Sequence, residues 1–242
     1  MKIIKFKKTK NSLYLLELDN NEEIEVHEDL ILKHELLLNK EIKNKEALIE
    51  ENKKYLAYDL SLRYIARKEI SKKELREYLK KKEYDDLVID ETIERLVKEK
   101  ALDELRLTRA YIKTKLLTSS DGPYKIKRNL LDKEIPELMI DEELVVFTKE
   151  EQLKRISKLK DKYLKSKRNK SFYNIKNSLY AYLSNLGYEK SYIVEAIDNL
   201  SYDETSAREK EYEKLKKVLA RKYSGDELER KIKAKLYERG FQ

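Results

Sequence analysis

The sequence has no cysteine, and its 242 residues include only four glycines and two prolines. The absence of cysteine excludes disulfides, thiolate metal sites and cysteine nucleophiles, and it suits a reducing compartment. So few turn-forming residues disfavour a compact all-β fold. No run of 18 apolar residues occurs, and the basic N-terminus leads into no apolar signal segment. We therefore expect a cytoplasmic protein without a membrane span.

Catalytic signatures are also lacking. The chain has no Walker A, G-x-S-x-G or H-E-x-x-H pattern, and its two histidines, His27 and His34, have no supporting metal ligands in a recognisable spacing. Asp103 and Glu104 are adjacent carboxylates, but they precede a predicted helix, where acids cap the first turn and favour the helix dipole. We expect a protein that is not an enzyme and that carries no cofactor or metal.

Charged residues make up 42% of the chain and hydrophobic residues 40%. The net charge is +8, and it is concentrated in the C-terminal half, where residues 149–202 hold 12 basic and 6 acidic side chains. Such a surface attracts phosphate or an acidic protein, although lysine-rich helix faces are also common as solvated surface. Apolar residues recur at helical spacing along most of the chain, which argues against disorder.

One apolar pattern returns four times, with spacings of 51, 53 and 53 residues that are identical in three independent columns. The columns are Leu75, Ile126, Leu179 and Ile232; Leu79, Leu130, Leu183 and Leu236; and Tyr84, Ile135, Tyr188 and Phe241. Unrelated amphipathic helices drift relative to one another, so a shared register indicates a true internal repeat.

Each copy is predicted to form three helices. In the first copy, Ser71 and Glu74 form a capping box that starts the second helix, and in the second copy Gly122-Pro123 and Pro136 give the corresponding start signals. A three-helix unit of this size has too little interior to stand alone. Neighbouring copies are therefore expected to bury their faces against each other as a solenoid.

Residues 1–43 differ from the rest, since they alternate like three short strands and end in a short helix that begins at His27. The predicted fold class is thus mainly α, an elongated solenoid of tandem three-helix, helix-turn-helix-like repeats that follows a small β-rich N-terminal domain. The predicted domains are 1–43 for the β-rich domain, 44–103, 104–148 and 149–202 for three repeats, and 203–242 for a partial fourth repeat.

Three ordered motifs occur in the runs from Ala66 to Leu75, from Leu102 to Tyr111 and from Gly122 to Leu130. They resemble, in this order, the L-x-R-R-E-x-S-x-x-E-L opening, the L-D-D-x-x-[FY]-A-x-x-[FWY] signature and the G-P-x-x-I-x-x-x-L segment of the RecX family of bacterial regulatory proteins. The resemblance covers about residues 55–242, and the β-rich segment is similar to the extension of Gram-positive members.

The chain departs from the family pattern at a few positions. Glu104, Leu107 and Thr108 replace the second Asp, the aromatic residue and the Ala of the signature. Glu83 and Glu134 occupy turn positions where the family usually has Gly, as Gly187 does here. A Glu at positive φ costs about 1 kcal/mol, so we expect these two turns to be rebuilt or mildly strained.

The resemblance implies a regulator that binds the RecA nucleoprotein filament and inhibits its ATPase, strand-exchange and coprotease activities in recombination, DNA repair and the SOS response. An alternative is a helical-repeat protein that binds DNA directly, and a third is an inert scaffold. We expect a monomer in which the partial fourth repeat caps the array, although that repeat could also pair with a second chain.

Basic residues at the start of each repeat's second helix, and along the third repeat, are the candidate partner-binding residues. A helix N-terminus with added cations suits phosphate or carboxylate, whereas pairing with nearby acids is the structural alternative, which we favour slightly for repeat one. Repeat two has no acid between Pro123 and Leu131, and repeat three is the most basic. The candidates are Arg67, Lys68, Lys72, Lys125, Lys127, Arg128, Lys154, Arg155, Lys158, Lys162, Lys165 and Arg168.

Overall fold

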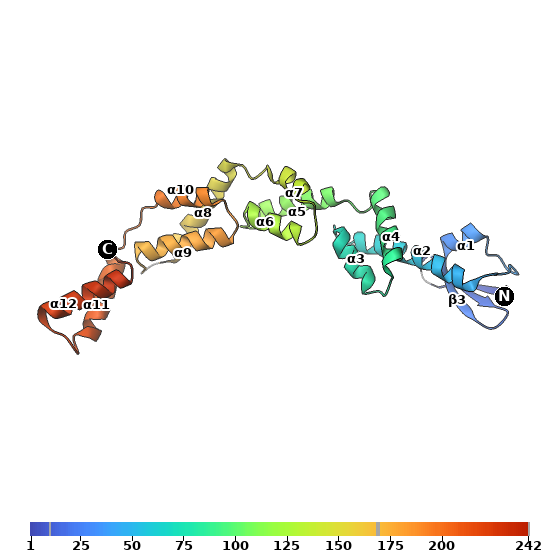
Figure 1. Ribbon diagram of the computed structural model, residues 1–242, viewed down its shortest axis with the longest axis horizontal. Coiled ribbons are helices and arrows are strands. Elements are labelled where there is room, and N and C mark those ends of the chain that lie inside the picture. The colour runs from blue at the N-terminus through green and yellow to red at the C-terminus, as the bar shows by residue number, and fades with distance from the viewer. Residues whose placement is uncertain (10, 168–169, 242) are drawn as a thin grey trace. The chain divides into compact units, whose positions relative to one another are not determined.

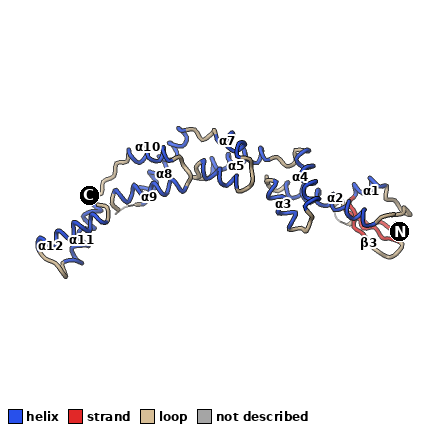
Figure 2. Tube along the Cα trace, in the orientation of Figure 1, coloured by secondary structure: helices blue, strands red, loops and turns tan. Residues whose placement is uncertain are grey.

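The structure is a computed structural model that describes residues 1–9, 11–167 and 170–241. These residues form one three-stranded sheet at the N-terminus and twelve helices after it (Figures 1 and 2). The predicted class, mainly helical with a small β-rich N-terminal part, is confirmed. Two compact units are formed, one by residues 1–107 with 133–135, the other by residues 108–132 with the described residues from 136 onward. Within the described residues, none of the helices combines the length and apolar composition that crossing a bilayer demands.

The N-terminal sheet is an antiparallel meander. Its strands are β1 (Ile3–Lys8), β2 (Leu13–Leu18) and β3 (Glu23–His27), in the order β1-β2-β3. Alternate residues of β2 and β3 point inward, and Leu16 and Leu18 are fully buried. Helix α1 (Glu28–His34) and the start of α2 (Lys45–Ile65) cover this face with Leu30 and Leu48. The sheet thereby gains the apolar partner that three short strands need.

The first unit continues with one three-helix bundle. It consists of α2, which begins after Asn44, α3 (Lys72–Lys80) and α4 (Asp86–Lys98). The predicted capping box is present, because the Ser71 hydroxyl accepts from the Glu74 backbone N–H while the Glu74 carboxylate accepts from that of Ser71.

The second unit holds the remaining helices, except that the first four residues of α5 belong to the first unit. They are α5 (Glu104–Thr118), α6 (Pro123–Leu131), α7 (Glu137–Leu144), α8 (Lys149–Ser166), α9 (Phe172–Asn185), α10 (Lys190–Asp198), α11 (Thr205–Leu219) and α12 (Gly225–Glu238). Helices α8, α9 and α10 share one apolar core, while α11 and α12 pair around another.

The repeated apolar positions lie in these cores. Eleven of the twelve are buried, and Tyr84 is half-buried. The turn after the second helix contains another equivalent position in all four copies. Its residues are Glu83, Glu134, Gly187 and Gly240, and their φ angles are 64°, 60°, 83° and 79°. The chain thus makes the same left-handed turn each time, and two glutamates bear the strain that glycine avoids. The predicted boundaries of the repeats stay a prediction.

The N-terminus of the second helix meets an acceptor from the following copy. The Glu104 carboxylate accepts from the Lys72 backbone N–H at 3.3 Å, and the Glu204 carboxylate accepts from that of Phe172 at 2.6 Å. At α6 the acceptor is a backbone group instead, since the Leu186 carbonyl accepts from the Gly122 N–H at 2.6 Å. Amides that a helix start leaves without a partner are therefore satisfied across the junctions between copies.

Candidate partner-binding surface

The cations predicted in repeat one are mostly paired with acids. Lys72 lies 3.0 Å from the Glu104 carboxylate, and Lys68 lies 3.4 Å from that of Glu74. Arg67 is exposed in the turn after α2 and forms no ion pair with the described residues. Ion pairing therefore accounts for Lys68 and Lys72, while the charge of Arg67 is not compensated by any residue that the structure describes.

Two of the three cations in repeat two are also paired. Lys127 lies 2.6 Å from Asp141 and 2.7 Å from Glu137, both on α7, and hydrogen bonds to these acids raise its pKa. Lys125 lies 2.7 Å from Asp121, one turn earlier. These acids lie outside Pro123–Leu131, the segment that has no acid of its own, so the local sequence does not reveal the pairing. Arg128 is exposed and has no ion pair among the described residues.

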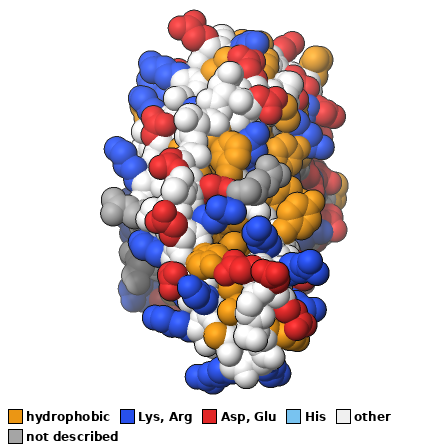
Figure 3. Space-filling model, turned by 90° about the vertical axis from the view of Figure 1, so that its left-hand side faces the viewer, with side chains coloured by type: hydrophobic (Ala, Val, Ile, Leu, Met, Phe, Trp, Pro, Cys, Tyr) orange, Lys and Arg blue, Asp and Glu red, His pale blue; other side chains and the backbone are white. Residues whose placement is uncertain are grey.

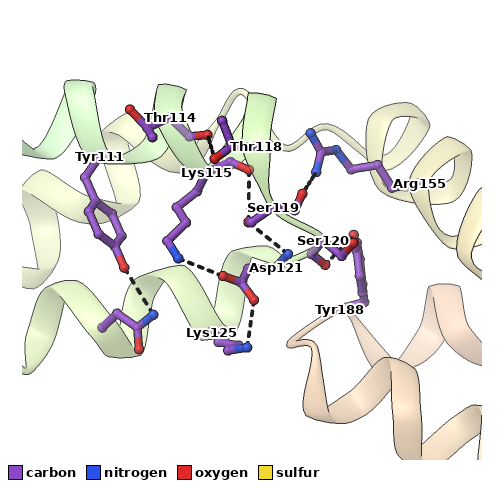
Figure 4. A network of polar contacts seen from close by, with 11 residues as sticks. Tyr111, Thr114, Lys115, Thr118, Ser119, Ser120, Asp121, Lys125, Arg155 and Tyr188 are labelled. Atoms are coloured by element: carbon purple, nitrogen blue, oxygen red, sulfur yellow. Dashed lines mark hydrogen bonds and ion pairs between the residues drawn. The ribbon is translucent and has the colours of Figure 1, made fainter.

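Asp121 organises the loop before α6 (Figure 4). Its side chain is 10% exposed and lies 3.0 Å from Lys115 and 2.7 Å from Lys125, so two ammonium groups compensate one carboxylate. Burial raises the pKa of Asp121, but hydrogen bonds from Lys125 and Lys115 outweigh it and hold the pKa below its ordinary value. The loop is therefore fixed from the α5 side and from the α6 side.

Arg155 of α8 fixes the same loop from a third direction (Figure 4). Its guanidinium donates to the carbonyl oxygens of Leu116 and Ser119 and lies 2.7 Å from Glu151. Tyr188 adds a hydrogen bond from its hydroxyl to the Ser120 carbonyl at 3.1 Å. Arg155 is only 15% exposed, so the structure places this candidate among packing residues rather than on an open surface.

Four candidates in repeat three remain uncompensated and share one face of α8. Lys154, Lys158, Lys162 and Lys165 are exposed, and no ion pair joins them to the residues the structure describes. At 100° and 1.5 Å per residue they cover about 80° of the helix circumference and about 16 Å of its length. We call these residues the α8 lysine stripe. Arg168, the remaining candidate, lies outside the described residues.

A cavity of about 250 Å³ opens beside the N-terminal end of the α8 lysine stripe. Lys154 and Lys158 line it on one side, with Ser119 and Ser120 on the other. The sequence predicts the loop at residues 118–123, but not that it lies beside α8, because only the tertiary structure brings residues 119 and 154 together. The Ser119 hydroxyl donates to the Lys115 carbonyl, and Glu151 and Arg155 also line the cavity, so the two ammonium groups share it with one carboxylate.

The exposed face that carries the stripe has no apolar residue. The inward face of α8 is formed instead by Gln152, Ile156 and the half-buried Leu159 and Tyr163. Protein interfaces are generally depleted in lysine and have an apolar centre, whereas phosphate backbones are contacted mainly by lysine and arginine. The stripe is thus suited to a ligand that is recognised by its charge. Within the described residues no cluster of acids and histidines is arranged for a metal ion.

Comparison with known proteins agrees with this architecture. A family model described as "RecX, first three-helix domain" matches residues 57–96, which lie within α2–α4. The protein named "Regulatory protein RecX" from Enterococcus faecalis is 31% identical over 99% of this chain and 92% of its own length. The protein of the same name from Streptococcus agalactiae is 34% identical over all of this chain and 95% of its own length.

Two solved structures share the fold. One, "Crystal structure of regulatory protein RecX", matches with a TM-score of 0.71 and 23% identity over 82% of this chain and 99% of that one. The other, RecX from Lactobacillus salivarius, matches with a TM-score of 0.58 over 62% of this chain and 97% of that one. The helical architecture and the full-length relatives together establish that the chain belongs to the RecX family of regulatory proteins.

Proposed function

We propose that this protein regulates RecA recombinase in the cytoplasm by binding the RecA nucleoprotein filament, without catalysing a reaction itself. Binding would inhibit the ATPase, strand-exchange and coprotease activities of the filament, and so limit recombination, DNA repair and the SOS response. Membership in the RecX family is the observation that carries this proposal. The protein is expected to act as a monomer.

The α8 lysine stripe supports the proposal as a contact surface. Four ammonium groups on one helix face suit the filament, which is a polyanion and presents the same groups at every turn. Repeated units of this chain can also engage successive subunits, so each weak contact raises the effective concentration for the next one. Because of these repeated contacts, the protein binds the filament in preference to free RecA. Arg67 and Arg128 are further candidates, since both are exposed and uncompensated by described residues.

The decisive experiment measures the single-strand-dependent ATPase of RecA from Enterococcus faecalis, the source of one relative. The protein is titrated at fixed salt in amounts well below those of RecA. We expect inhibition at these low ratios. Replacing the four lysines of the stripe by glutamine should raise the concentration needed for half inhibition about tenfold, because each lost phosphate or carboxylate contact is worth about 1 kcal/mol or less at an exposed site.

A matched control removes the same number of charges elsewhere. Lys81, Lys82, Lys98 and Lys113 are exposed and have no ion pair among the described residues, so their replacement by glutamine changes the net charge equally. This control should inhibit like the unmodified protein. If ATPase activity stays constant at every ratio, the regulator proposal fails. If both quadruple variants are weakened equally, net charge rather than the stripe is responsible.

Direct binding to nucleic acid is the second candidate, and the predominantly cationic face of α8 favours it. Fluorescence anisotropy with a labelled oligo-dT strand at several salt concentrations tests it without RecA. Four phosphate contacts predict a slope of log Kobs against log salt of about −3 for a single strand, and the stripe variant should lose most of it. Tight, salt-dependent binding without any effect on RecA would favour this candidate over the regulator.

A further inference from the structure

In repeats one and two, one cation of the second helix holds two acids of the third helix. Arg76 of α3 pairs with Asp90 and, at 3.9 Å, with Asp86, both on α4, while Lys80 of α3 lies closer to Asp86, at 2.9 Å. Lys127 of α6 pairs in the same way with two acids of α7. The acids are four residues apart in each case, so one helix face presents both to the same cation.

The apolar residues of these third helices have the same spacing. Relative to the first acid, apolar residues follow at three, seven and ten positions. They are Ile89, Ile93 and Leu96 after Asp86, and Ile140, Leu144 and Phe147 after Glu137. All but Leu144, which is half-buried, are buried. The third helix thus contacts the other helices of its repeat through an apolar stripe and through two acids at the edge of that stripe.

Repeat three lacks both the cation of the second helix and the two acids of the third helix. There the second helix carries Tyr180 in place of Arg76 or Lys127, and the third helix carries Lys190 and Val194 in place of the two acids. The apolar residues remain, as Ile193 and Ile197 are buried. In these three copies, the cation therefore occurs only where the third helix carries the two acids.

Lys233 occupies this position in α12. It directly follows Ile232, as Arg76 follows Leu75 in repeat one. Lys233 is exposed, and it forms no ion pair with any residue that the structure describes. Lys233 lines a groove beside α11 and α12 instead.

The α11–α12 groove has a volume of about 400 Å³. It is lined by Arg208, Glu209, Tyr212, Glu213, Lys233 and Leu236. Leu236 forms an apolar floor with the half-buried ring of Tyr212, and Tyr237 beside it is 75% exposed. Figure 3, drawn from the side on which α11 and α12 lie in Figure 1, shows hydrophobic side chains at the surface between charged ones.

We propose that the α11–α12 groove binds an amphipathic helix of a partner protein, which lies on α11 and α12 as α4 lies on α2 and α3. This helix carries two acids four residues apart for Lys233 and apolar residues three, seven and ten positions after the first acid. Helix-in-groove recognition commonly uses such anchors. A second copy of this chain fits less well, because α4 and α7 already bury these residues in their own repeats.

The chain itself supplies a probe. A peptide of residues 86–98 has the required pattern, and a lactam between its outward-facing Glu94 and Lys98 side chains offsets the low helicity of so short a peptide. Titration calorimetry with the full chain should give saturable binding at one site. Amide shifts in the NMR spectrum should change mainly in α11 and α12.

Charge reversal tests whether Lys233 pairs with the two acids of the peptide. Lys233→Glu should weaken binding of this peptide about tenfold or more, because attraction is replaced by repulsion. A peptide with Asp86→Lys and Asp90→Lys should bind the Lys233→Glu protein and not the unmodified one. Lys231→Glu is the control, since Lys231 is exposed on α12 but does not line the groove.

Three results would overturn the proposal. The first is the absence of peptide binding to a chain whose circular dichroism shows a folded protein. The second is a site that is not the groove. Either Lys233→Glu leaves binding unchanged, or the amide shifts change only in α2 and α3, and the latter would mean that the peptide only displaces α4. The third is a dimer that Lys233→Glu dissociates, because a second copy would then occupy the groove. None of these readouts requires RecA, so they are independent of the proposed regulatory function.

Discussion

Gly122 and Gly187 approach each other so closely that neither position has room for a side chain. A Cβ atom on Gly122 would lie 2.6 Å from the carbonyl carbon of Gly187, and one on Gly187 would lie 2.7 Å from the Cβ of Lys125. The close approach lets the backbone N–H of Tyr124 donate to the Gly187 carbonyl at 3.0 Å. The first turn of α6 is thus satisfied by the turn that follows α9.

Alanine at Gly187 should destabilise the protein strongly. The added Cβ overpacks a backbone contact, which costs about 1–3 kcal/mol, and the φ angle of 83° adds strain of about 1 kcal/mol for a residue other than glycine. Gly225 separates the two effects, since its φ is 54° but no atom lies within 4 Å of its Cβ position. Urea unfolding should therefore show a clearly larger loss for Gly187→Ala than for Gly225→Ala, and equal losses would disprove the steric argument.

Glycine at Glu83 should stabilise the protein. Glu83 has a φ of 64° and its side chain has no hydrogen-bond or ion-pair partner among the described residues, whereas Glu134 in the equivalent turn pairs with Lys73. Relief of the left-handed strain gains about 1–2 kcal/mol, and the greater freedom of glycine in the unfolded chain returns about 0.5–1 kcal/mol. Glu83→Gly is expected to raise the free energy of unfolding by about 0.5–1 kcal/mol, measured by urea denaturation.

Glu83→Ala is the control for that substitution, because alanine removes the carboxylate but keeps the Cβ atom. It should leave stability nearly unchanged. A gain in Glu83→Ala that equals the gain in Glu83→Gly would show that charge, not backbone conformation, is relieved at this turn.

The repeat was the part of the fold most accessible from sequence. Leu75 and its counterparts keep one register, and burial of a repeated apolar position needs no knowledge of distant contacts. The strain at Glu83 and Glu134 was predictable in the same way, by equivalence with Gly187. The rebuilt turn that was the alternative is not what the structure shows, since both glutamates adopt positive φ.

The candidate surface was less predictable because ion pairing depends on tertiary contacts. Lys127 lies in a sequence window without acids, yet α7 brings two carboxylates to it. Arg155 lies in the most basic segment, yet carbonyl oxygens of the preceding loop hold it. Helical spacing alone did place Lys154 and Lys158 on one face, but the sequence could not reveal that their charges stay uncompensated by the described residues.

Glu104 should contribute to stability through its contact with the start of α3, two helices earlier in the chain. The sequence predicted that Asp103 and Glu104 cap the second repeat, and Asp103 does accept from the Arg106 N–H at 3.0 Å. Glu104 instead reaches the start of α3, where it accepts from the Lys72 backbone N–H and pairs with the Lys72 ammonium. Glu104→Ala leaves that amide without this acceptor and should cost about 1–3 kcal/mol.

The Glu104→Gln variant keeps an oxygen for the amide but loses the charge. Because the side chain of Lys72 is 48% exposed, that ion pair is worth about 1 kcal/mol or less. Thermal unfolding should therefore rank the variants with Glu104→Gln between the unmodified protein and Glu104→Ala. Equal melting temperatures for the two variants would show that the ion pair, not the amide contact, is the main contribution.

Stability should depend on pH through Asp121. Its pKa lies below the ordinary value in the folded protein, because Lys125 and Lys115 outweigh the effect of burial. A carboxylate with a depressed folded pKa stabilises the fold above its unfolded pKa of about 3.9, and this contribution is lost as the pH falls through the folded pKa. Acidification below about pH 4 should therefore remove the contribution of Asp121.

Asp121→Asn isolates that contribution, since the amide preserves size but cannot compensate two ammonium groups. At pH 7 the variant should unfold more easily by about 1–3 kcal/mol, which is the range for disrupting a hydrogen bond to a charged, largely buried group. Urea unfolding at pH 7, 5, 4 and 3 should show this difference constant down to about pH 4 and smaller at pH 3. A difference that stays constant to pH 3 would mean that shape or hydrogen bonding at residue 121, rather than its charge, holds the loop.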